Sequence, residues 1–415
     1  MRWLKWLYPG MRVKRWIILF AFGTILVAVS FGLFWTGVEL QAPARVILGV
    51  FIFLVGIISL IIGIRKMVKS FITVFLPRRE KDLVDIIFRQ RQLSKGPKIV
   101  VIGGGTGLSV LLHGLKEMTS NITAIVTVAD DGGSSGRLRT EFDVLPPGDI
   151  RNCLVALADA EPLMRDLFQF RFDEGEGLKG HNFGNLFITA LSKITGDFEK
   201  AIKESSKVLA IRGQVVPSTL EKVALVAKRV DGTQTLGEST IPKVLSPIRK
   251  VHLSPAVCKP TAEAIQAIKD ADAIVIGPGS LYTSIIPNLL VEGITEMILR
   301  SHAIKIYICN VMTQHGETDG YTASDHVEAI IKHTHPTLID YCIVNTSSKV
   351  PEHLLMRYKE EKAYPVEADI KKIRNLGIAV VEGNVVNLEN YVRHNPEKLA
   401  KIIVGIINSA KATSV

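Results

Sequence analysis

The chain has 415 residues, of which 47% are hydrophobic, and a formal net charge of +10. Residues 1–80 contribute +9 of this charge and the remaining residues only +1, which excludes a protein that binds nucleic acid through a generally basic folded surface. No two of the four cysteines lie closer than 33 residues, which excludes a disulfide framework and a cysteine-based metal site.

Two long uncharged runs occupy the N-terminal segment, at residues 16–38 and 46–64. About 20 apolar residues in a helix cross a membrane core, so both runs are long enough. The seven-residue connection between them predicts a tight transmembrane hairpin over residues 1–66. A buried pair of soluble helices is the first alternative. A cleaved signal peptide with "APA" as its cleavage site is the second, but the first run is too long for one and another run follows at once.

Basic residues crowd the outer ends of this predicted hairpin, with five before the first run and five after the second. The positive-inside rule then places both ends in the cytoplasm. The sequence therefore predicts a multi-pass protein of the cell membrane, with a basic linker at 67–97 and a large cytoplasmic domain at 98–415.

Short apolar runs alternate with helical patterns in this predicted domain. The runs "KIVVIGGG", "ITAIVTVADD", "ADAIVIGPGS", "AIKIYICNVM", "DYCIVNT" and "IAVVEGNVV" each end in glycine or polar residues. Such alternation predicts an α/β fold with a mainly parallel sheet covered on both faces. In such sheets ligands bind beyond the carboxyl ends of the strands, which is where the unusual residues fall.

The first of these strand ends reads "GGGTG" and opens a helix. Glycines allow a ligand to approach the backbone, and a helix N-terminus offers free N–H groups to a diphosphate. The candidate nucleotide-binding residues are Gly103, Gly104, Gly105, Thr106 and Gly107. The dinucleotide fingerprint is incomplete because Leu108 takes its third glycine position. A tight turn without a ligand is the alternative.

The second strand is followed by "ADDGGSSGR". Either acid could bond a ribose hydroxyl, or the two could bind a Mg²⁺ that a diphosphate also contacts. The serines and the arginine suit phosphate oxygens. The candidate residues are Asp130, Asp131, Gly133, Ser134, Ser135 and Arg137, with Asp130 and Asp131 also the candidate metal ligands. A capped helix start is the alternative.

Two further motifs open helices, "PPGDIRNCLVAL" and "GHNFGNL". Asp149 and Asn152 of the first are candidate nucleotide ligands, although Asp149 could equally be a plain N-cap. His181, Asn182 and Asn185 of the second suit hydrogen bonding to a base or sugar. His181 could also act as a general acid or base, with a structural role equally open.

Later strand ends repeat the pattern in "IGPGSLYTSIIPN" and "CNVMTQHGETDGY". The first suggests close approach of backbone to ligand and an exposed Tyr282 that stacks on a nucleobase. The candidate residues are Gly277, Pro278, Gly279, Ser280, Tyr282, Thr283, Asn310 and Thr313. Together the strand ends predict a large phosphorylated ligand lying across one edge of the sheet.

With these motifs in view, the chain resembles the bacterial gluconeogenesis factor family, whose relatives include 2-phospho-L-lactate transferase. The resemblance covers about 98–345 and rests on "GGGTGLSVLL", "ITAIVTVADDGGSSGRLR", "PPGDIRNCLVAL", "GESTIP", "IGPGSLYTSIIPNLL" and "YICNVMTQHGET". It implies a Rossmann-like, doubly wound nucleotide-binding fold. It also implies binding of UDP-N-acetylglucosamine and support of cell shape during gluconeogenic growth. Typical members begin near the first strand, so the hairpin is a departure from the family pattern.

These implications lead to a first hypothesis, a non-catalytic UDP-sugar-binding regulator of carbon flux to cell-wall precursors. Its expected partners are the membrane, a cell-wall precursor enzyme and a second copy of the chain, with no nucleic acid. The alternative is a transferase that moves a phospholactyl group from a guanylyl diphosphate, with Asp130, Asp131 and Mg²⁺ neutralising the diphosphate. The missing third glycine counts against an NAD-dependent oxidoreductase. No cofactor other than Mg²⁺ is expected.

Overall fold

The computed structural model describes residues 14–75, 83–347, 350–388 and 391–413. The chain divides into two compact units, Met1–Gln90 and Arg91–Val415. Each unit is described by itself below. Parts of the predicted basic termini and of the predicted linker lie outside the described residues.

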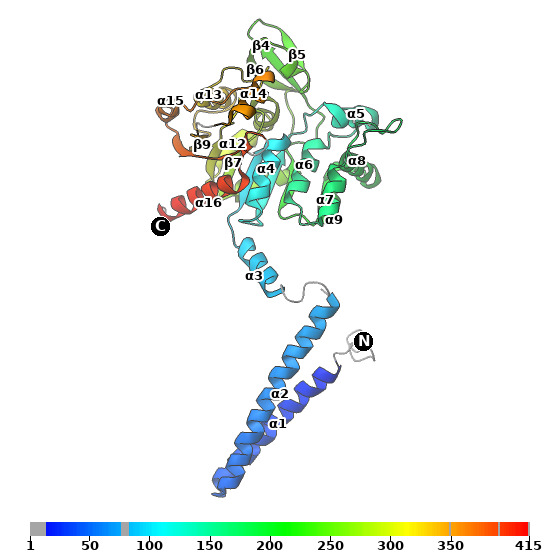
Figure 1. Ribbon diagram of the computed structural model, residues 1–415, viewed down its shortest axis with the longest axis vertical. Coiled ribbons are helices and arrows are strands. Elements are labelled where there is room, and N and C mark those ends of the chain that lie inside the picture. The colour runs from blue at the N-terminus through cyan, green and yellow to red at the C-terminus, as the bar shows by residue number, and fades with distance from the viewer. Residues whose placement is uncertain (1–13, 76–82, 348–349, 389–390, 414–415) are drawn as a thin grey trace. The chain divides into compact units, whose positions relative to one another are not determined.

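Two long antiparallel helices form the first unit, α1 (Lys14–Glu39) and α2 (Pro43–Phe75) (Figure 1). By length and composition, both could cross a membrane. Small buried residues recur every seven positions along their contact. They are Gly23, Ser30 and Gly37 in α1 and Gly49, Gly56 and Gly63 in α2. A period of seven keeps one seam of each helix against its partner, as in a coiled coil, and small side chains let the backbones approach.

Replacement of Gly56 by leucine is expected to open this helical hairpin. A Cβ on Gly56 would lie 2.9 Å from Val27 Cγ2 and 3.1 Å from Val27 N, so a larger side chain pushes the helices apart. Spin labels at Ile18→Cys and Ile64→Cys should then report a longer and broader distance distribution in detergent micelles. Gly32→Leu is the matched control, because no atom lies within 4 Å of a Cβ at that position. Equal distributions for both variants would contradict this packing.

The predicted linker is largely helical where the structure describes it. Helix α2 continues to Phe75, and α3 (Leu83–Ser94) precedes the first strand. The division between the units falls inside α3, so the boundary predicted at residue 98 remains a prediction.

A seven-stranded parallel sheet forms the centre of the second unit, in the order β10-β9-β8-β7-β1-β2-β3. Its strands are β1 (Ile99–Gly103), β2 (Ile122–Val126), β3 (Gln214–Pro217), β7 (Ala273–Ile276), β8 (Ile304–Ile308), β9 (Tyr341–Asn345) and β10 (Ala379–Gly383). The inner strands β1, β2 and β7 are buried along their whole length, as their β-branched runs predict. The predicted α/β fold with a parallel sheet is therefore confirmed.

The strand order changes direction between β1 and β7. From β1 the chain proceeds to β2 and β3 on one side, and from β7 it proceeds to β8, β9 and β10 on the other. Right-handed crossovers then put the connecting helices on opposite faces of the sheet. On one face α4 (Gly105–Leu115) packs against α6 (Gly148–Leu157) and α16 (Pro396–Thr413). A crevice at such a switch point is the usual ligand site.

The remaining helices complete the two layers and the connections. They are α5 (Gly133–Phe142), α7 (Pro162–Gln169), α8 (Phe183–Thr195), α9 (Phe198–Val208), α10 (Ala262–Asp270), α11 (Ile286–Leu289), α12 (Ile294–Arg300), α13 (Ala323–His333), α14 (Glu352–Glu360) and α15 (Ile370–Asn375). A 3₁₀ turn spans Ile241–Lys243 and a π-helical turn spans Leu281–Ile285.

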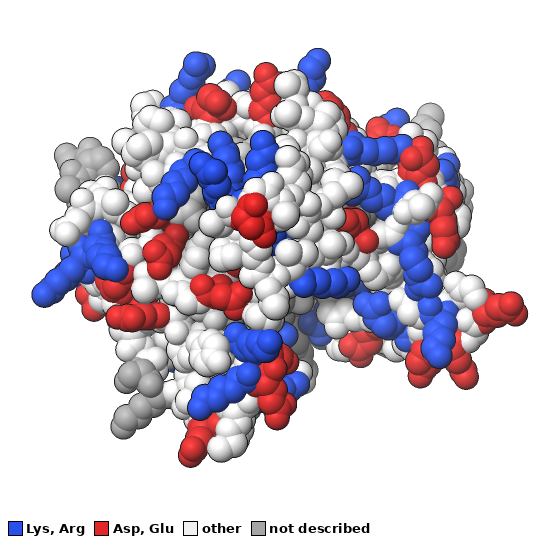
Figure 2. Space-filling model, turned by 90° about the horizontal axis from the view of Figure 1, so that it is seen from above, with Lys and Arg blue, Asp and Glu red and all other residues white. Residues whose placement is uncertain are grey.

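Two small antiparallel sheets flank the main one. The first contains β4 (Ala224–Arg229), β5 (Gln234–Leu236) and β6 (Ile248–Ser254), with β4 and β5 forming an antiparallel hairpin (Figure 1). The second pairs β11 (Val386–Asn387) with β12 (Arg393–His394). Figure 2 shows acidic and basic side chains interspersed over one face of the molecule, in keeping with the near-neutral charge after residue 80.

Candidate functional site

The turns that follow β1 and β7 contact each other at the switch point. A Cβ on Gly107 would lie 2.7 Å from Pro278 O and 3.0 Å from Gly279 Cα, so only glycine allows this approach. Asn310, which follows β8, donates a hydrogen bond from Nδ2 to Gly279 O at 2.9 Å. Three strand ends are therefore locked together, and the first turn of α4 lies beside them.

A cavity of about 570 Å³ opens at this place, and we call it the sheet-end cavity. Nine of the predicted nucleotide-binding residues line it: Gly104, Gly105, Thr106, Gly107, Pro278, Gly279, Ser280, Asn310 and Thr313. The volume falls in the range typical of small-molecule sites. The lining combines the N-terminus of α4 with hydroxyl and amide side chains, which suits a phosphorylated ligand.

One strong cation belongs to this lining. Arg393 on β12 is the single Lys or Arg among the described residues that line the sheet-end cavity. Two guanidinium groups lie over the Tyr391 ring, with Arg393 Cζ at 4.7 Å and Arg357 Cζ at 4.4 Å from its centroid. Arg357 also donates to Tyr391 Oη at 3.0 Å. Two stacked cations on one ring make this rim attractive to an anion.

Asp149 ties the glycine turn to α6. A Cβ on Gly104 would lie 2.5 Å from Asp149 Oδ2, and the Gly105 N–H donates a hydrogen bond to this carboxylate. Asp149 is not an N-cap, because Pro147 holds that position and no side chain caps α6. Asp149 thus connects the glycine turn to α6 through this hydrogen bond.

Four carboxyl groups with raised pKa values surround this turn. Burial, then the charge of Asp130, raises the pKa of Asp149 to about 7. Burial raises the pKa of Glu317 to about 7, and burial followed by Asp130 and Asp149 raises the pKa of Glu238 to about 8. Burial also raises the pKa of Asp130. Burial, reinforced by neighbouring carboxylates at Asp149 and Glu238, favours protonation, which reduces the negative charge that an anionic ligand meets.

Replacement of Glu238 by glutamine is expected to stabilise the protein at pH 8 but not at pH 4. The folded chain retains a Glu238 proton that the unfolded chain releases above its ordinary pKa of 4.5. Stability is therefore lost as pH rises from about 4.5 to about 8, and the amide removes this loss. Thermal melts in EDTA should show a Tm gain of roughly 2–6 °C at pH 8. A lower Tm for the glutamine variant at pH 8 would refute the assignment.

The two predicted metal ligands, Asp130 and Asp131, accept hydrogen bonds from different backbone N–H groups. Asp130 Oδ1 accepts from Gly132 N at 2.9 Å, whereas Asp131 Oδ1 accepts from Ser239 N at 2.8 Å. No group of three or more His, Cys, Asp or Glu side chains in the described part of the chain converges on a metal-sized site. Magnesium often binds through one or two carboxylates plus ligand phosphates. The two aspartates could therefore hold Mg²⁺ only with oxygen atoms that a ligand supplies.

Several predicted ligands instead form a buried network between α5 and α8. Ser134 Oγ lies 3.1 Å from His181 Nδ1, and Asn182 caps α8 by accepting from Asn185 N. Asn185 Nδ2 donates to Ser135 Oγ at 3.5 Å. None of these five residues lines the sheet-end cavity, and neither do Gly103, Asp130, Asp131, Gly133, Arg137 and Gly277. The network fixes the loop after β2 against α8.

The expectation that Tyr282 is exposed is wrong. Only 3% of Tyr282 is exposed, and its hydroxyl lies 2.7 Å from the Tyr321 hydroxyl. It does not line the cavity because the π-helical turn directs it into the core, edge-on to His333. Thr283 is also buried and donates to Glu317 Oε1 at 3.1 Å. Both residues support the turn from within.

The sequence reasoning missed the wall contributed by the C-terminal part of the domain. These residues are Tyr358, Glu361, Ala363, Tyr391, Val392, Arg393 and His394, together with Pro242. Pro242 lies in the 3₁₀ turn, and the others come from α14, β12 and adjoining loops, which lack the glycine-rich strand ends used as the guide. The available signal was "YVRHNP", in which an aromatic residue and a cation precede a helix that begins with proline.

Comparison with known proteins gives consistent results. Residues 99–386 match the family model of 2-phospho-L-lactate transferase CofD. The gluconeogenesis factors of Halalkalibacterium halodurans and Bacillus subtilis are 52% and 51% identical, over 75% and 76% of this chain and 96% and 99% of their own lengths. A crystal structure of a UPF0052-family protein from Bacillus halodurans has a TM-score of 0.73 at 52% identity and covers 75% of this chain and 99% of its own.

A further relative bears on the hairpin. A protein from Nostoc sp. is 49% identical over 97% of this chain and 92% of its own length. An alignment of that extent includes most of the two N-terminal helices. The sequence that forms the hairpin therefore aligns with a relative, whereas the shorter relatives align over 75% of this chain.

Proposed function

Because this chain belongs to the gluconeogenesis factor family and contains a CofD-type domain, we propose that it binds UDP-N-acetylglucosamine in the sheet-end cavity. We assign it the role of a membrane-anchored regulator that adjusts carbon flux toward cell-wall precursors, and thereby cell shape, under gluconeogenic growth. The observation that carries the proposal is the cavity at the switch point, which is lined by both the N-terminus of α4 and Arg393.

The chemistry of the lining supports a diphosphate-linked sugar. The N–H groups after Gly105 at the start of α4 favour a negative charge, and Arg393 can bond two phosphate oxygens at once. The side chains of Ser280, Asn310 and Thr313 add hydroxyl and amide groups. Such groups recognise sugar hydroxyls and an acetamido group. No general base and nucleophile pair is needed for this role, because the ligand returns unchanged.

The helical hairpin supports the membrane location. Its basic flanks favour a topology with both ends in the cytoplasm, where cell-wall precursors are made. A membrane-bound sensor would then sample precursor levels at the surface where they are used.

Isothermal titration of the 91–415 unit with UDP-N-acetylglucosamine, GTP and NAD tests the binding proposal. We expect the UDP-sugar to bind most tightly and to be recovered intact. Tighter binding of GTP or NAD, or consumption of the UDP-sugar, would overturn it. A reporter fused after Val415 tests the topology and should be cytoplasmic.

The CofD match supports a second candidate, a transferase that passes a phospholactyl group from a guanylyl diphosphate to an alcohol and releases GMP. The acids beside the glycine turn, Asp130 above all, would hold Mg²⁺ together with the diphosphate. Mg²⁺-dependent release of GMP from lactyl diphospho-guanosine would favour this candidate over the regulator.

A further inference from the structure

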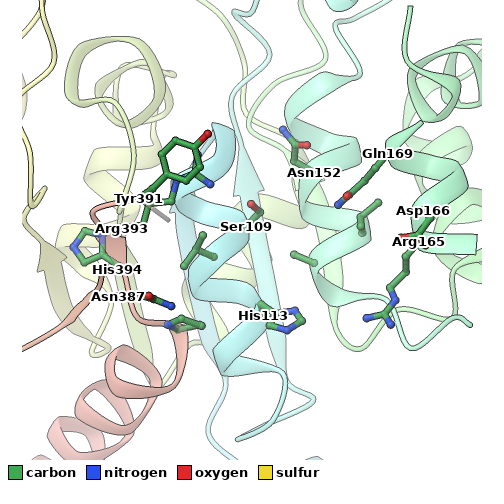
Figure 3. Close-up of a pocket in the computed structure, with 14 residues that line it drawn as sticks. Ser109, His113, Asn152, Arg165, Asp166, Gln169, Asn387, Tyr391, Arg393 and His394 are labelled. Carbon is green, nitrogen blue, oxygen red and sulfur yellow. The ribbon is translucent and has the colours of Figure 1, made fainter. Parts of the chain in front are cut away.

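A second cavity, of about 480 Å³, lies alongside α4 (Figure 3). Its walls come from α4, α6 and α7 and from the segment that contains β11, β12 and the start of α16. It shares only Val110, Tyr391, Arg393 and His394 with the sheet-end cavity. We call it the α4–α7 cavity.

Polar groups in this cavity are held in defined orientations. Asn152 Oδ1 accepts from Arg151 at 2.6 Å, so the Asn152 NH₂ group is left to donate. His394 Nε2 lies 3.1 Å from Cys309 O, and a carbonyl can only accept, so Nε2 carries the proton and Nδ1 is an acceptor. Burial lowers the pKa of His394 to about 4, so the ring is neutral at physiological pH. Figure 3 shows Asn152 and Gln169 facing the space beside Ser109.

Positive charge predominates at this place. Arg165 on α7 and Arg393 on β12 line opposite walls, and Asp166 is the one carboxylate among the described lining residues. The backbone N–H of Arg165 donates to Glu161 O within the helix, but the Arg165 side chain makes no ion pair or hydrogen bond with another described residue. The pKa of His113, which lines the same cavity, is lowered by burial first and also by the positive charges of Lys116 and Arg165. An anion would relieve this unbalanced charge.

We propose that the α4–α7 cavity is a second ligand site, for a compact metabolite that carries at least two negative charges, and that Arg165 is its main charge partner. The donors around the cavity are Arg165, Arg393, Asn152 and Gln169, which suit phosphate or carboxylate oxygens. The acceptors are His394 Nδ1 and Ser109 Oγ, which suit hydroxyl groups. A phosphate ester of a small polyol or a hydroxylated polycarboxylate has this combination.

The shared wall couples this site to the sheet-end cavity, a part of the inference that rests on the proposed function. Arg393 lines both cavities, and one guanidinium cannot serve two anions fully. Two anionic ligands on either side of β12 also repel each other. Occupation of the α4–α7 cavity therefore weakens UDP-sugar binding, and by linkage the UDP-sugar weakens the second ligand by the same factor.

The 91–415 unit is suitable for the test. It contains the whole seven-stranded sheet and its core, and the Halalkalibacterium halodurans relative has little sequence beyond the part that matches it. Glycerol 3-phosphate and citrate are the probes, one for phosphate and one for carboxylate recognition. Each is titrated into the wild type, Arg165→Ala and Arg300→Ala. Arg300 is an exposed arginine on α12 outside both cavities, so it controls for the loss of one charge.

We expect at least one probe to bind the wild type and Arg300→Ala alike, and Arg165→Ala at least tenfold more weakly. Failure of both probes to bind at millimolar concentration overturns the site, and so does binding that Arg165→Ala leaves unchanged. These outcomes do not depend on the UDP-sugar, so they remain decisive if the proposed function fails.

A second titration tests the coupling. Without probe, Arg165→Ala should bind UDP-N-acetylglucosamine within twofold of the wild type. A saturating probe should raise the Kd of the wild type for the UDP-sugar at least about threefold. A loss of UDP-sugar affinity in Arg165→Ala as large as that caused by Arg393→Ala would make the cavity part of the nucleotide site and overturn the proposal. An unchanged Kd in the presence of the probe would overturn the coupling.

Discussion

Replacement of Arg393 by alanine is expected to weaken UDP-N-acetylglucosamine binding by about 30- to 150-fold. Arg393 is the single Lys or Arg in the described lining of the sheet-end cavity, so it is the main side-chain cation for a diphosphate there. Removal of one partner from a charged hydrogen-bonded pair costs about 2–3 kcal/mol at a half-open site. At 25 °C each 1.4 kcal/mol corresponds to a tenfold change in Kd.

The charge and the shape of the guanidinium can be separated with a second variant. Arg393→Lys keeps the positive charge but loses the planar fork that bonds two oxygens. It should fall between the wild type and Arg393→Ala. Arg393 and Arg357 both contact the Tyr391 ring, so circular dichroism and thermal melts should check that both variants keep the β12 segment folded. Arg300→Ala is the charge control. Wild-type affinity in Arg393→Ala would place the diphosphate elsewhere.

The fold of the large domain could be predicted from its sequence because each inner strand is a short buried run. β1, β2 and β7 are buried along their length, and each is followed by glycine or polar residues. A parallel sheet requires this pattern since helices cover both faces. β3 has four residues and lies at one edge of the sheet, so its pattern was too short to identify.

The parts of the candidate site that are formed by backbone turns could be predicted from the sequence. The parts that are formed by side chains could be predicted less well. The turn at Gly104 to Gly107 and the turn at Pro278 and Gly279 both line the sheet-end cavity, while their contact with a nucleotide remains a prediction. A glycine pattern reports backbone geometry, which is local. By contrast, Ser134 and Tyr282 have the right chemistry, but their partners His181 and Tyr321 lie 47 and 39 residues away. The sequence alone does not show which polar side chains satisfy one another.

Asn152 and Arg393 also show that the sequence alone does not reveal which side chains line a given cavity. Asn152 was predicted as a nucleotide ligand and lines the α4–α7 cavity instead. Arg393 was not predicted and lines both cavities. It lies 286 residues after Gly107 in the chain, on a strand of two residues, where no periodic pattern exists. Only the return of the chain after β10 brings it to the carboxyl end of β1.

Replacement of Gly107 by alanine is expected to impair both binding and stability. The new methyl group would lie 2.7 Å from Pro278 O and 3.0 Å from Gly279 Cα, and backbone atoms cannot turn aside as a side chain can. The turns after β1 and β7 must therefore separate. Overpacking of this kind costs about 1–3 kcal/mol, or roughly 2–10 °C in Tm for a domain of this size. UDP-sugar affinity should fall by about 10- to 100-fold, because hydrogen bonds weaken steeply when donors move.

Two glycines of the same chain provide matched controls for this prediction. A Cβ on Gly103, four residues earlier, would make ordinary contacts at 3.6 Å or more with the Leu108 side chain, so Gly103→Ala should change affinity less than threefold. Gly405, an exposed position inside α16, has no neighbour within 4 Å, and alanine there should stabilise the helix by about 0.5–1 kcal/mol. If Gly107→Ala behaved like Gly103→Ala in titration and in thermal melts, the contact between the two turns would not be what shapes the cavity. The ligand would then have to be held by the C-terminal wall around Arg393 alone.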